Sequence, residues 1–366
     1  MKKQNRAILI ALDNKDIPDL SILLDELELL LSNLGIKVIY RSIQKKDAPD
    51  PAFMLGKGKA TEVAVLCEEL QADLVVSDER LNPTQMANLK ELTGREIWDR
   101  AFVIMKIFQA RAHTAEAKLQ VELARCAYEI PLLKGLGKQM SRPGGGIGTR
   151  GPGETEFERH RRKLERRTRD IKKRLKKVEK RRTYQRKRRQ KAGMPVISLV
   201  GYTNSGKSTL LKRLSSDNSL DAAERLFCTL DTFMRRVRFP AGSDILISDT
   251  VGFIRRLPPD LIAAFNTTLE EIRWSKLLIL VLDSSSASAM EHFDVVQQTL
   301  YDVGASSLPR LVVLNKIDKT DPDIIASYVD RLSQMGEDVV SISSITGEGF
   351  INFKNCVEEL VSSLLL

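Results

Sequence analysis

The fold is decided by the stretch Val196-Ile197-Ser198-Leu199-Val200-Gly201-Tyr202-Thr203-Asn204-Ser205-Gly206-Lys207-Ser208. An apolar run that leads into a glycine, four residues and then Gly-Lys-Ser predicts a strand, a phosphate-binding loop and a helix. In such a loop the backbone N–H groups and the helix N-terminus cradle the α- and β-phosphates of a nucleotide. Lys207 would neutralise the β- and γ-phosphates, and Ser208 would bind Mg²⁺. A plain glycine turn is the alternative, which the flanking pattern disfavours.

Three further polar segments follow apolar runs, where parallel α/β sheets bind their ligands. Asn315-Lys316-Ile317-Asp318 follows the run 311–314, and its last carboxylate can accept hydrogen bonds from the N1–H and 2-amino groups of guanine. Adenine lacks that donor pair. Asp249-Thr250-Val251-Gly252 suits an aspartate that holds Mg²⁺ through water and a glycine whose N–H meets the γ-phosphate. Ser343-Ser344-Ile345 would complete the base pocket, so the pattern predicts a Ras-like GTPase domain.

Two switch segments complete the predicted catalytic site. In the first, Thr229 is our choice for a second Mg²⁺ ligand, with Thr232 as the alternative. In the second, Phe253 stands where Ras-type enzymes carry the glutamine that orients the attacking water. A phenyl ring cannot position water, so we expect slow intrinsic turnover. Asn204 is a candidate for holding K⁺, with a bracing role in the loop as the alternative.

The predicted catalytic residues are Lys207, Thr229 and Gly252. The predicted metal ligands are Ser208 and Thr229, with Asp249 acting through water. The predicted GTP-binding residues are Gly201, Tyr202, Thr203, Asn204, Ser205, Gly206, Lys207, Ser208, Phe227, Cys228, Thr229, Leu230, Asp231, Asp249, Thr250, Val251, Gly252, Asn315, Lys316, Ile317, Asp318, Ser343, Ser344 and Ile345.

The positive charge of the chain is concentrated in one segment. The 366 residues carry a net charge of +10, but residues 159–191 alone hold 20 lysines and arginines against three acidic residues. Such a run repels itself unless a polyanion is near, which favours contact with nucleic acid over a merely solvated face. Aromatic residues are scarce there, so we expect recognition of RNA backbone and shape rather than base stacking.

Two long helices are predicted around a glycine-rich tip. Apolar residues at helical spacing predict one helix over 101–130, which Pro131 would end, and a second over 154–191. The connection 132–153 is rich in glycine and is interpreted as the tip of a hairpin arm, with a flexible linker as the alternative. Its predicted RNA contacts are Arg142, Gly144, Gly145, Gly146 and Arg150.

Residues 1–98 alternate between strand-like and helix-like patterns. Strands are predicted over 7–12, 37–43 and 73–77, and helices over 20–34, 59–70 and 83–92. This alternation indicates a small parallel α/β subdomain. Trp98 and Trp274 are interpreted as core or packing residues, and the three histidines are too dispersed for a triad or a metal site.

Five segments of the chain carry a resemblance to a known family. They are Gly56-Lys57-Gly58-Lys59, Lys118-Leu119-Gln120-Val121-Glu122-Leu123-Ala124, Gly144-Gly145-Gly146-Ile147-Gly148-Thr149-Arg150-Gly151-Pro152-Gly153-Glu154, Gly201-Tyr202-Thr203-Asn204 and Asp249-Thr250-Val251-Gly252-Phe253-Ile254-Arg255. With these segments in this order, the chain resembles the HflX family of ribosome-associated GTPases. The resemblance implies an N-terminal α/β subdomain, a helical hairpin, a GTPase domain and binding to the rRNA of the large ribosomal subunit. It also implies the splitting of stalled or stressed ribosomes.

The sequence therefore predicts an α/β chain with a small parallel α/β subdomain over 1–100, a basic helical hairpin over 101–193 and a GTPase domain over 194–366. GTP, GDP, Mg²⁺ and K⁺ are the expected small ligands. The four cysteines are scattered and never paired at metal-ligand spacing, which favours a reducing cytoplasm, and the apolar runs are too short for a membrane span. We expect a monomer, because the hairpin can pack on itself. The alternative function is an RNA-docking GTPase that monitors or matures the large subunit, with GTP timing its release.

Overall fold

The computed structural model describes residues 5–14, 19–140, 152–191, 193–215, 233–240, 242, 244–250, 252–256, 261 and 271–364. They fall into two compact units. Unit 1 comprises Met1–Ala110, Lys118–Leu175 and Pro258–Leu261. Unit 2 comprises Arg111–Ala117, Lys176–Leu257 and Ile262–Leu366.

Unit 1 begins with a four-stranded parallel sheet in the order β2-β1-β3-β4. Both faces of β1 are covered, because Ala7 to Leu12 are at most 1% exposed and alternate residues of a strand face opposite sides. The predicted α/β alternation is confirmed, with one strand, β4, that we had not expected. The elements are β1 (Asn5–Asp13), α1 (Leu20–Asn33), β2 (Ile36–Lys45), α2 (Lys57–Glu69), β3 (Leu74–Ser77), α3 (Pro83–Thr93) and β4 (Glu96–Asp99).

The prediction of one helix over 101–130 is wrong in two respects. The chain forms α4 (Arg100–Arg111) and then a separate helix, α5 (Ala115–Met140). The break arises because the Thr114 hydroxyl accepts a hydrogen bond from the Ala117 N–H at 3.1 Å, which caps α5. The helix also continues through Pro131 instead of ending there. A proline removes one hydrogen bond and bends a helix without always ending it, and Pro131 lies on an exposed side of α5.

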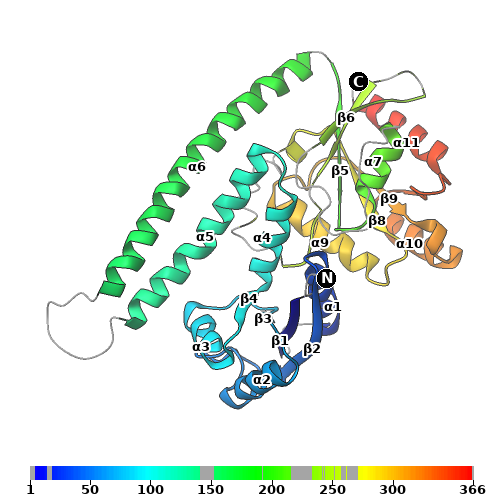
Figure 1. Ribbon diagram of the computed structural model, residues 1–366. Helices are drawn as coiled ribbons and strands as arrows, with labels where there is room; N and C mark the ends of the chain where they lie inside the picture. Colours follow the sequence, from blue (N-terminus) through cyan, green and yellow to red (C-terminus); the bar gives the residue numbers. More distant parts are fainter. Residues whose placement is uncertain are drawn as a thin grey trace. The chain divides into compact units, whose positions relative to one another are not determined.

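Helices α5 and α6 (Pro152–Lys191) lie side by side (Figure 1). The 40 residues of α6 extend over about 60 Å. A narrow apolar seam joins the two helices, and the Arg167 guanidinium donates two hydrogen bonds to the Glu122 carboxylate at 2.5 and 2.8 Å. The seam is formed by Leu164, Ile171 and Leu175 of α6, which pack with Leu119, Leu123 and Cys126 of α5. Most of the lysines and arginines of α6 outside this seam are exposed.

Unit 2 is built on a six-stranded sheet in the order β10-β9-β8-β5-β7-β6, in which only the pairing of β6 with β7 is antiparallel. Strand β5 therefore lies inside the sheet, between β8 on one side and β7 on the other. Its elements are β5 (Val196–Gly201), α7 (Lys207–Ser215), β6 (Phe233–Arg238), β7 (Asp244–Asp249), β8 (Leu277–Asp283), α9 (Ala289–Asp302), β9 (Arg310–Asn315), the 3₁₀ turn η1 (Ile317–Lys319), α10 (Pro322–Gln334), β10 (Asp338–Ser341) and α11 (Phe350–Ser363).

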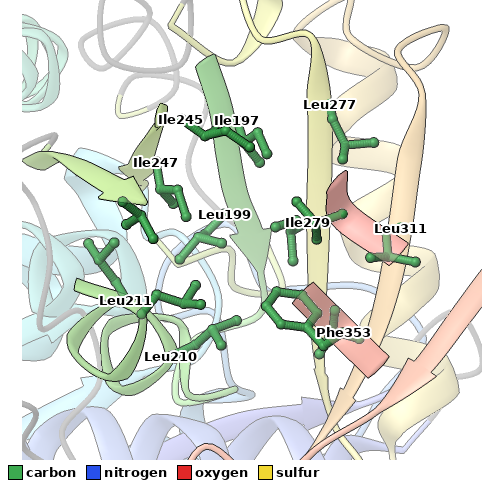
Figure 2. Packing of buried hydrophobic residues seen from close by; sticks show 14 of the residues in the cluster. Ile197, Leu199, Leu210, Leu211, Ile245, Ile247, Leu277, Ile279, Leu311 and Phe353 are labelled. Atoms are coloured by element: carbon green, nitrogen blue, oxygen red, sulfur yellow. The ribbon is translucent and has the colours of Figure 1, made fainter. Parts of the chain in front are cut away.

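Alternate residues of these strands face two separate cores. Figure 2 shows one of them, in which Leu210 and Leu211 of α7 and Phe353 of α11 pack with Leu199 of β5 and Ile279 of β8. The other core holds the side chains of α9 and α10 against the opposite face of β8 and β9. The sheet is thus covered on both sides, and only the ends of its strands and the connecting loops remain for ligands.

The two tryptophans differ in their surroundings. Trp98 packs edge-on against Phe102, with ring centroids 5.2 Å apart, as a packing residue should. The interpretation of Trp274 as a core residue is wrong, because its side chain is 56% exposed. Within the described ranges, none of the helices combines the length and apolar character that a bilayer crossing requires.

Candidate functional site

The loop between β5 and α7 lies at the centre of the candidate site. Its glycines are required by close packing: a Cβ at Gly201, whose φ is 154°, would lie 2.3 Å from the Val281 carbonyl oxygen. A Cβ at Gly206, with φ 96°, would lie 2.2 Å from the Asn315 side-chain nitrogen. Any larger residue would push the loop away from β8 and β9. The loop is therefore held directly over the ends of the central strands.

Lys207 is a buried cation in this loop. The residue is 7% exposed. Its Nζ donates hydrogen bonds to the carbonyl oxygens of Gly201 at 3.0 Å and Tyr202 at 2.7 Å. A phosphate group brought to the loop would meet this buried ammonium directly, so the arrangement suits an anionic ligand.

The Ser208 hydroxyl, at the start of α7, donates a hydrogen bond to Asp249 Oδ2 at 2.8 Å. Asp249 ends β7 and is 2% exposed. A hydroxyl and a carboxylate in contact form an all-oxygen donor set, which suits Mg²⁺ when nucleotide phosphates and waters supply the other ligands. No group of three histidine, cysteine or acidic side chains that could hold a metal exists among the described residues. These residues fit Mg²⁺ bound together with a nucleotide rather than a metal site formed by protein alone.

The segment after β7 pairs with the phosphate loop. The Phe253 N–H donates to the Gly201 carbonyl at 3.0 Å, and the Thr203 N–H donates to the Phe253 carbonyl at 2.8 Å. The Phe253 ring is 2% exposed and packs among apolar residues of α9 and β8. A Cβ on Gly252 would lie 3.2 Å from Lys207 Nζ, so this glycine allows the two segments to meet. Phe253 thus serves the core, as its apolar ring predicts.

The candidate base pocket is formed by β9, η1 and the loop after β10. Asn315 links three segments: its side-chain NH₂ donates to the Ser205 carbonyl at 2.9 Å, and its Oδ1 accepts from the Ser344 N–H at 3.0 Å. The Asp318 carboxylate is exposed and accepts a hydrogen bond from the Ser343 hydroxyl at 2.6 Å. This geometry orients a carboxylate for the paired donors of guanine.

Two residues of the base pocket, Asp283 and Arg213, were not predicted from the sequence. The Lys316 ammonium binds the Asp283 carboxylate at 2.6 Å, which ties the end of β9 to the end of β8. Asp283 follows the apolar run 277–282, a position that could have identified it. The Arg213 guanidinium, on α7, donates to the carbonyl oxygens of Ser344 at 3.3 Å, Ile345 at 2.6 Å and Thr346 at 3.0 Å. Nothing in the local pattern around Arg213 indicates this contact.

Replacing Arg213 with glutamine is expected to weaken binding of both GTP and GDP by about 10-fold, because hydrogen bonds from a charged group to the pocket loop are lost. Turnover at saturating GTP should stay within about twofold, since Arg213 contacts the loop after β10 and not the phosphate loop. Titration with a fluorescent nucleotide measures the affinities. Lys212→Gln on the same helix is the matched control. Unchanged affinities would contradict a positioning role for Arg213.

Tyr202 connects the phosphate loop to α9. Its hydroxyl accepts a hydrogen bond from the Arg255 N–H at 3.0 Å, and its ring stacks on His292 with centroids 3.9 Å apart and planes 15° from parallel. Arg255 pairs in turn with Glu291. Burial, aided by the charge of Arg255, lowers the pKa of His292 to about 4. The imidazole is therefore neutral at pH 7, and its stack with Tyr202 is uncharged.

The structure brings the predicted residues of all the described motifs to one edge of the sheet in unit 2. Asn204 lies in the same loop, exposed, with a left-handed backbone at φ 63°. Several predicted residues lie outside the described ranges: Phe227, Cys228, Thr229, Leu230, Asp231, Thr232 and Val251 of the nucleotide site, and the RNA contacts Arg142, Gly144, Gly145, Gly146 and Arg150.

Three sequence models of protein families match the chain. "GTP-binding GTPase N-terminal" matches residues 22–109, "GTP-binding GTPase Middle Region" matches 111–189, and "50S ribosome-binding GTPase" matches 196–316. The matched segments cover most of the chain and include the phosphate loop and Asn315.

Curated relatives are similar to this chain over most of its length. GTPase HflX of Caldanaerobacter subterraneus is 45% identical over 87% of this chain and 73% of its own length. GTPase HflX of Lacrimispora saccharolytica is 41% identical over 98% of this chain and 83% of its own length. Among solved structures, that of SsGBP in complex with GDP is similar with a TM-score of 0.54 and 27% identity, covering 99% of this chain and 100% of that one.

Proposed function

Because the chain belongs to the HflX family of GTPases, we propose that it binds the large ribosomal subunit in its GTP state and splits stalled or stressed ribosomes into subunits. The observation that carries this proposal is the presence, in one chain, of a nucleotide site and of a long helix, α6, whose basic faces suit rRNA. Residues 159–191 carry 20 cationic side chains against three acidic ones. Neutralising several phosphates gives such a segment strong, salt-dependent affinity for folded RNA.

The proposed chemistry is hydrolysis of the γ-phosphate with the following roles. Lys207 stabilises charge on the β- and γ-phosphates, and the Gly252 N–H donates to the γ-phosphate. Ser208 and Thr229 would hold Mg²⁺, with Asp249 contributing through water, and the ion would supply positive charge to the phosphates. Asp318, Ser343 and Ser344 select guanine. Loss of the γ-phosphate would release both switches and change the affinity for the partner.

The organisation of the chain follows from these roles. We propose an N-terminal subdomain over 1–100, a hairpin arm over 101–193 whose tip contacts rRNA through Arg142, Gly144, Gly145, Gly146 and Arg150, and a GTPase domain over 194–366. The protein would act in the cytoplasm as a monomer. The buried Phe253 cannot orient water, so the ribosome or a cation would complete the catalytic site.

Purified large ribosomal subunits are expected to raise GTP turnover at least about 10-fold, because the partner would supply the group that Phe253 does not. Release of phosphate with and without subunits measures this effect. Sedimentation of intact ribosomes with the protein and GTP, or a non-hydrolysable analogue, then tests splitting. If subunits stimulate turnover and ribosomes stay intact under both conditions, the chain docks on the large subunit to monitor or mature it. Equal turnover with and without subunits would contradict coupling to this partner.

Turnover is also expected to be several-fold faster in K⁺ than in Na⁺ at equal ionic strength. We propose that the exposed Asn204 helps hold K⁺ beside the β- and γ-phosphates, where a cation stabilises the charge of the transition state. Asn204→Ala should remove the difference between the two salts. Asn88→Ala, a substitution in α3 far along the sequence from the loop, should retain it. A variant at Asn204 that keeps the K⁺ dependence would mean that this residue only braces the loop.

A further inference from the structure

A pocket of about 320 Å³ lies in unit 2 where the last turns of α6 pass the start of β5. This volume is at the lower end of the range for small-ligand sites and suits a group as large as one nucleotide. It lies outside the candidate nucleotide site described above, since it shares no lining residue with the phosphate loop or the base pocket. The pocket is lined by Arg186, Arg189, Gly193, Met194, Pro195, Val196, Glu271, Trp274 and Lys276.

An exposed indole forms one side of this pocket. The Trp274 side chain is 56% exposed, although burying such a ring would stabilise the fold. The Arg186 guanidinium lies 5.1 Å from the ring centroid, in a cation–π contact that covers only part of the ring. Large aromatic rings that stay exposed beside cations are typical of surfaces that bind partners.

Hydrogen bonds on both sides of Trp274 hold it in place. The backbone N–H of Trp274 donates a hydrogen bond to the Glu271 carbonyl oxygen at 3.2 Å. The hydroxyls of the neighbouring Ser275 and of Ser198 lie 2.6 Å apart in the interior. The Lys276 N–H donates to the Val196 carbonyl at 2.8 Å, which attaches the segment to β5. These bonds fix the backbone on both sides of the indole, so the segment that carries Trp274 forms part of the pocket wall without a ligand.

The charges of the pocket suit a phosphate and a base together. Arg186, Arg189 and Lys276 supply cations, and one carboxylate, that of Glu271, lies among them. The Glu271 side chain is 5% exposed, and its ion pairs with Arg182 at 3.9 Å and Arg189 at 3.7 Å are longer than hydrogen bonds. This carboxylate can still accept hydrogen bonds from an amino group of a ligand.

We propose that this pocket binds one unpaired nucleotide of an RNA. The base stacks on Trp274, the flanking phosphates meet Arg186 and Lys276, and Glu271 accepts a hydrogen bond from the exocyclic amino group of the base. An acidic protein partner would use the cations and leave the flat ring and the buried carboxylate without a role. The site is a single stacking position beside a helix that otherwise recognises backbone, and it does not depend on subunit splitting.

Binding of a fluorescein-labelled single-stranded oligo(A) pentamer to the full chain, with GDP saturating the GTPase site, tests the proposal by anisotropy. Trp274→Ala should bind about 5- to 150-fold more weakly, since stacking of one base contributes that much. Trp274→Phe should stay close to the wild type because it retains a ring. Tyr301→Ala, which removes a 70% exposed aromatic ring of the same unit outside the pocket, is the matched control and should bind as the wild type does.

A second measurement reads the indole itself. In a Trp98→Phe variant, Trp274 is the one remaining tryptophan of the chain, and its emission should be quenched by the pentamer. Unchanged emission at saturating RNA, or equal affinities of Trp274→Ala and wild type, would overturn the proposal. Equal binding of free AMP and the pentamer would overturn the assignment to RNA and indicate a mononucleotide site. Ribosome splitting is measured separately, so a chain that splits ribosomes without using this pocket contradicts the pocket alone.

Discussion

GTP turnover by a Lys207→Ala variant is expected to fall at least about 100-fold, the usual cost of removing one group that stabilises transition-state charge. Lys207 is 7% exposed and its ammonium lies 2.7 Å from the Tyr202 carbonyl oxygen, so it is already positioned inside the loop that would receive the phosphates. Alanine leaves the developing negative charge on the γ-phosphate without its cation. Phosphate release at saturating GTP measures the loss.

The affinities of the same variant separate two roles of the lysine. Binding of GTP should weaken more than binding of GDP, because only GTP places a γ-phosphate beside the ammonium. Lys212→Ala, on the same helix but away from the loop, is the control and should keep wild-type turnover. The thermal unfolding temperature of both variants establishes that they are folded. Turnover of Lys207→Ala within about threefold of the wild type would show that this lysine only satisfies the carbonyls of its own loop.

An Asp318→Asn variant is expected to lose about 100-fold or more in affinity for GTP and to gain affinity for xanthosine triphosphate. The carboxylate accepts hydrogen bonds from two guanine donors. An asparagine amide can accept from one of them, but it presents its NH₂ group to the other, and these two donors both stay unpaired. Xanthine carries an oxygen at C2 in place of the amino group, so the asparagine NH₂ can donate to it. The substitution thus replaces the pairing of a carboxylate with guanine by the pairing of an amide with xanthine.

Competition between the two triphosphates for a fluorescent nucleotide measures this exchange. Asp321→Asn is a matched control, because Asp321 caps α10 by accepting from the Asp323 N–H at 2.9 Å and asparagine caps equally well. That variant should keep its preference for GTP. If Asp318→Asn still prefers GTP, the exposed carboxylate beside Ser343 does not read the base, and the guanine pocket must be sought elsewhere.

Local patterns determined much of this protein. The phosphate loop, the order of its partner motifs and the apolar strands are encoded in short stretches, because backbone geometry repeats every two or 3.6 residues. The predicted helix boundaries were wrong where the local sequence signal was weak. The cap at Thr114 separates α4 from α5, and α5 continues through Pro131. Both failures concern the ends of helices, which depend on single hydrogen bonds.

The sequence by itself determined which residues could meet a nucleotide, and only the tertiary structure decided which of them meet each other. Asn315 joins Ser205 and Ser344, which are 110 and 29 residues away, because the strand order places β9 beside β8 and β10. Arg213 reaches the same loop from α7, and Trp274 is exposed beside Arg186 although its type predicts burial. Such contacts depend on how distant segments pack, and no periodicity within one segment carries that information.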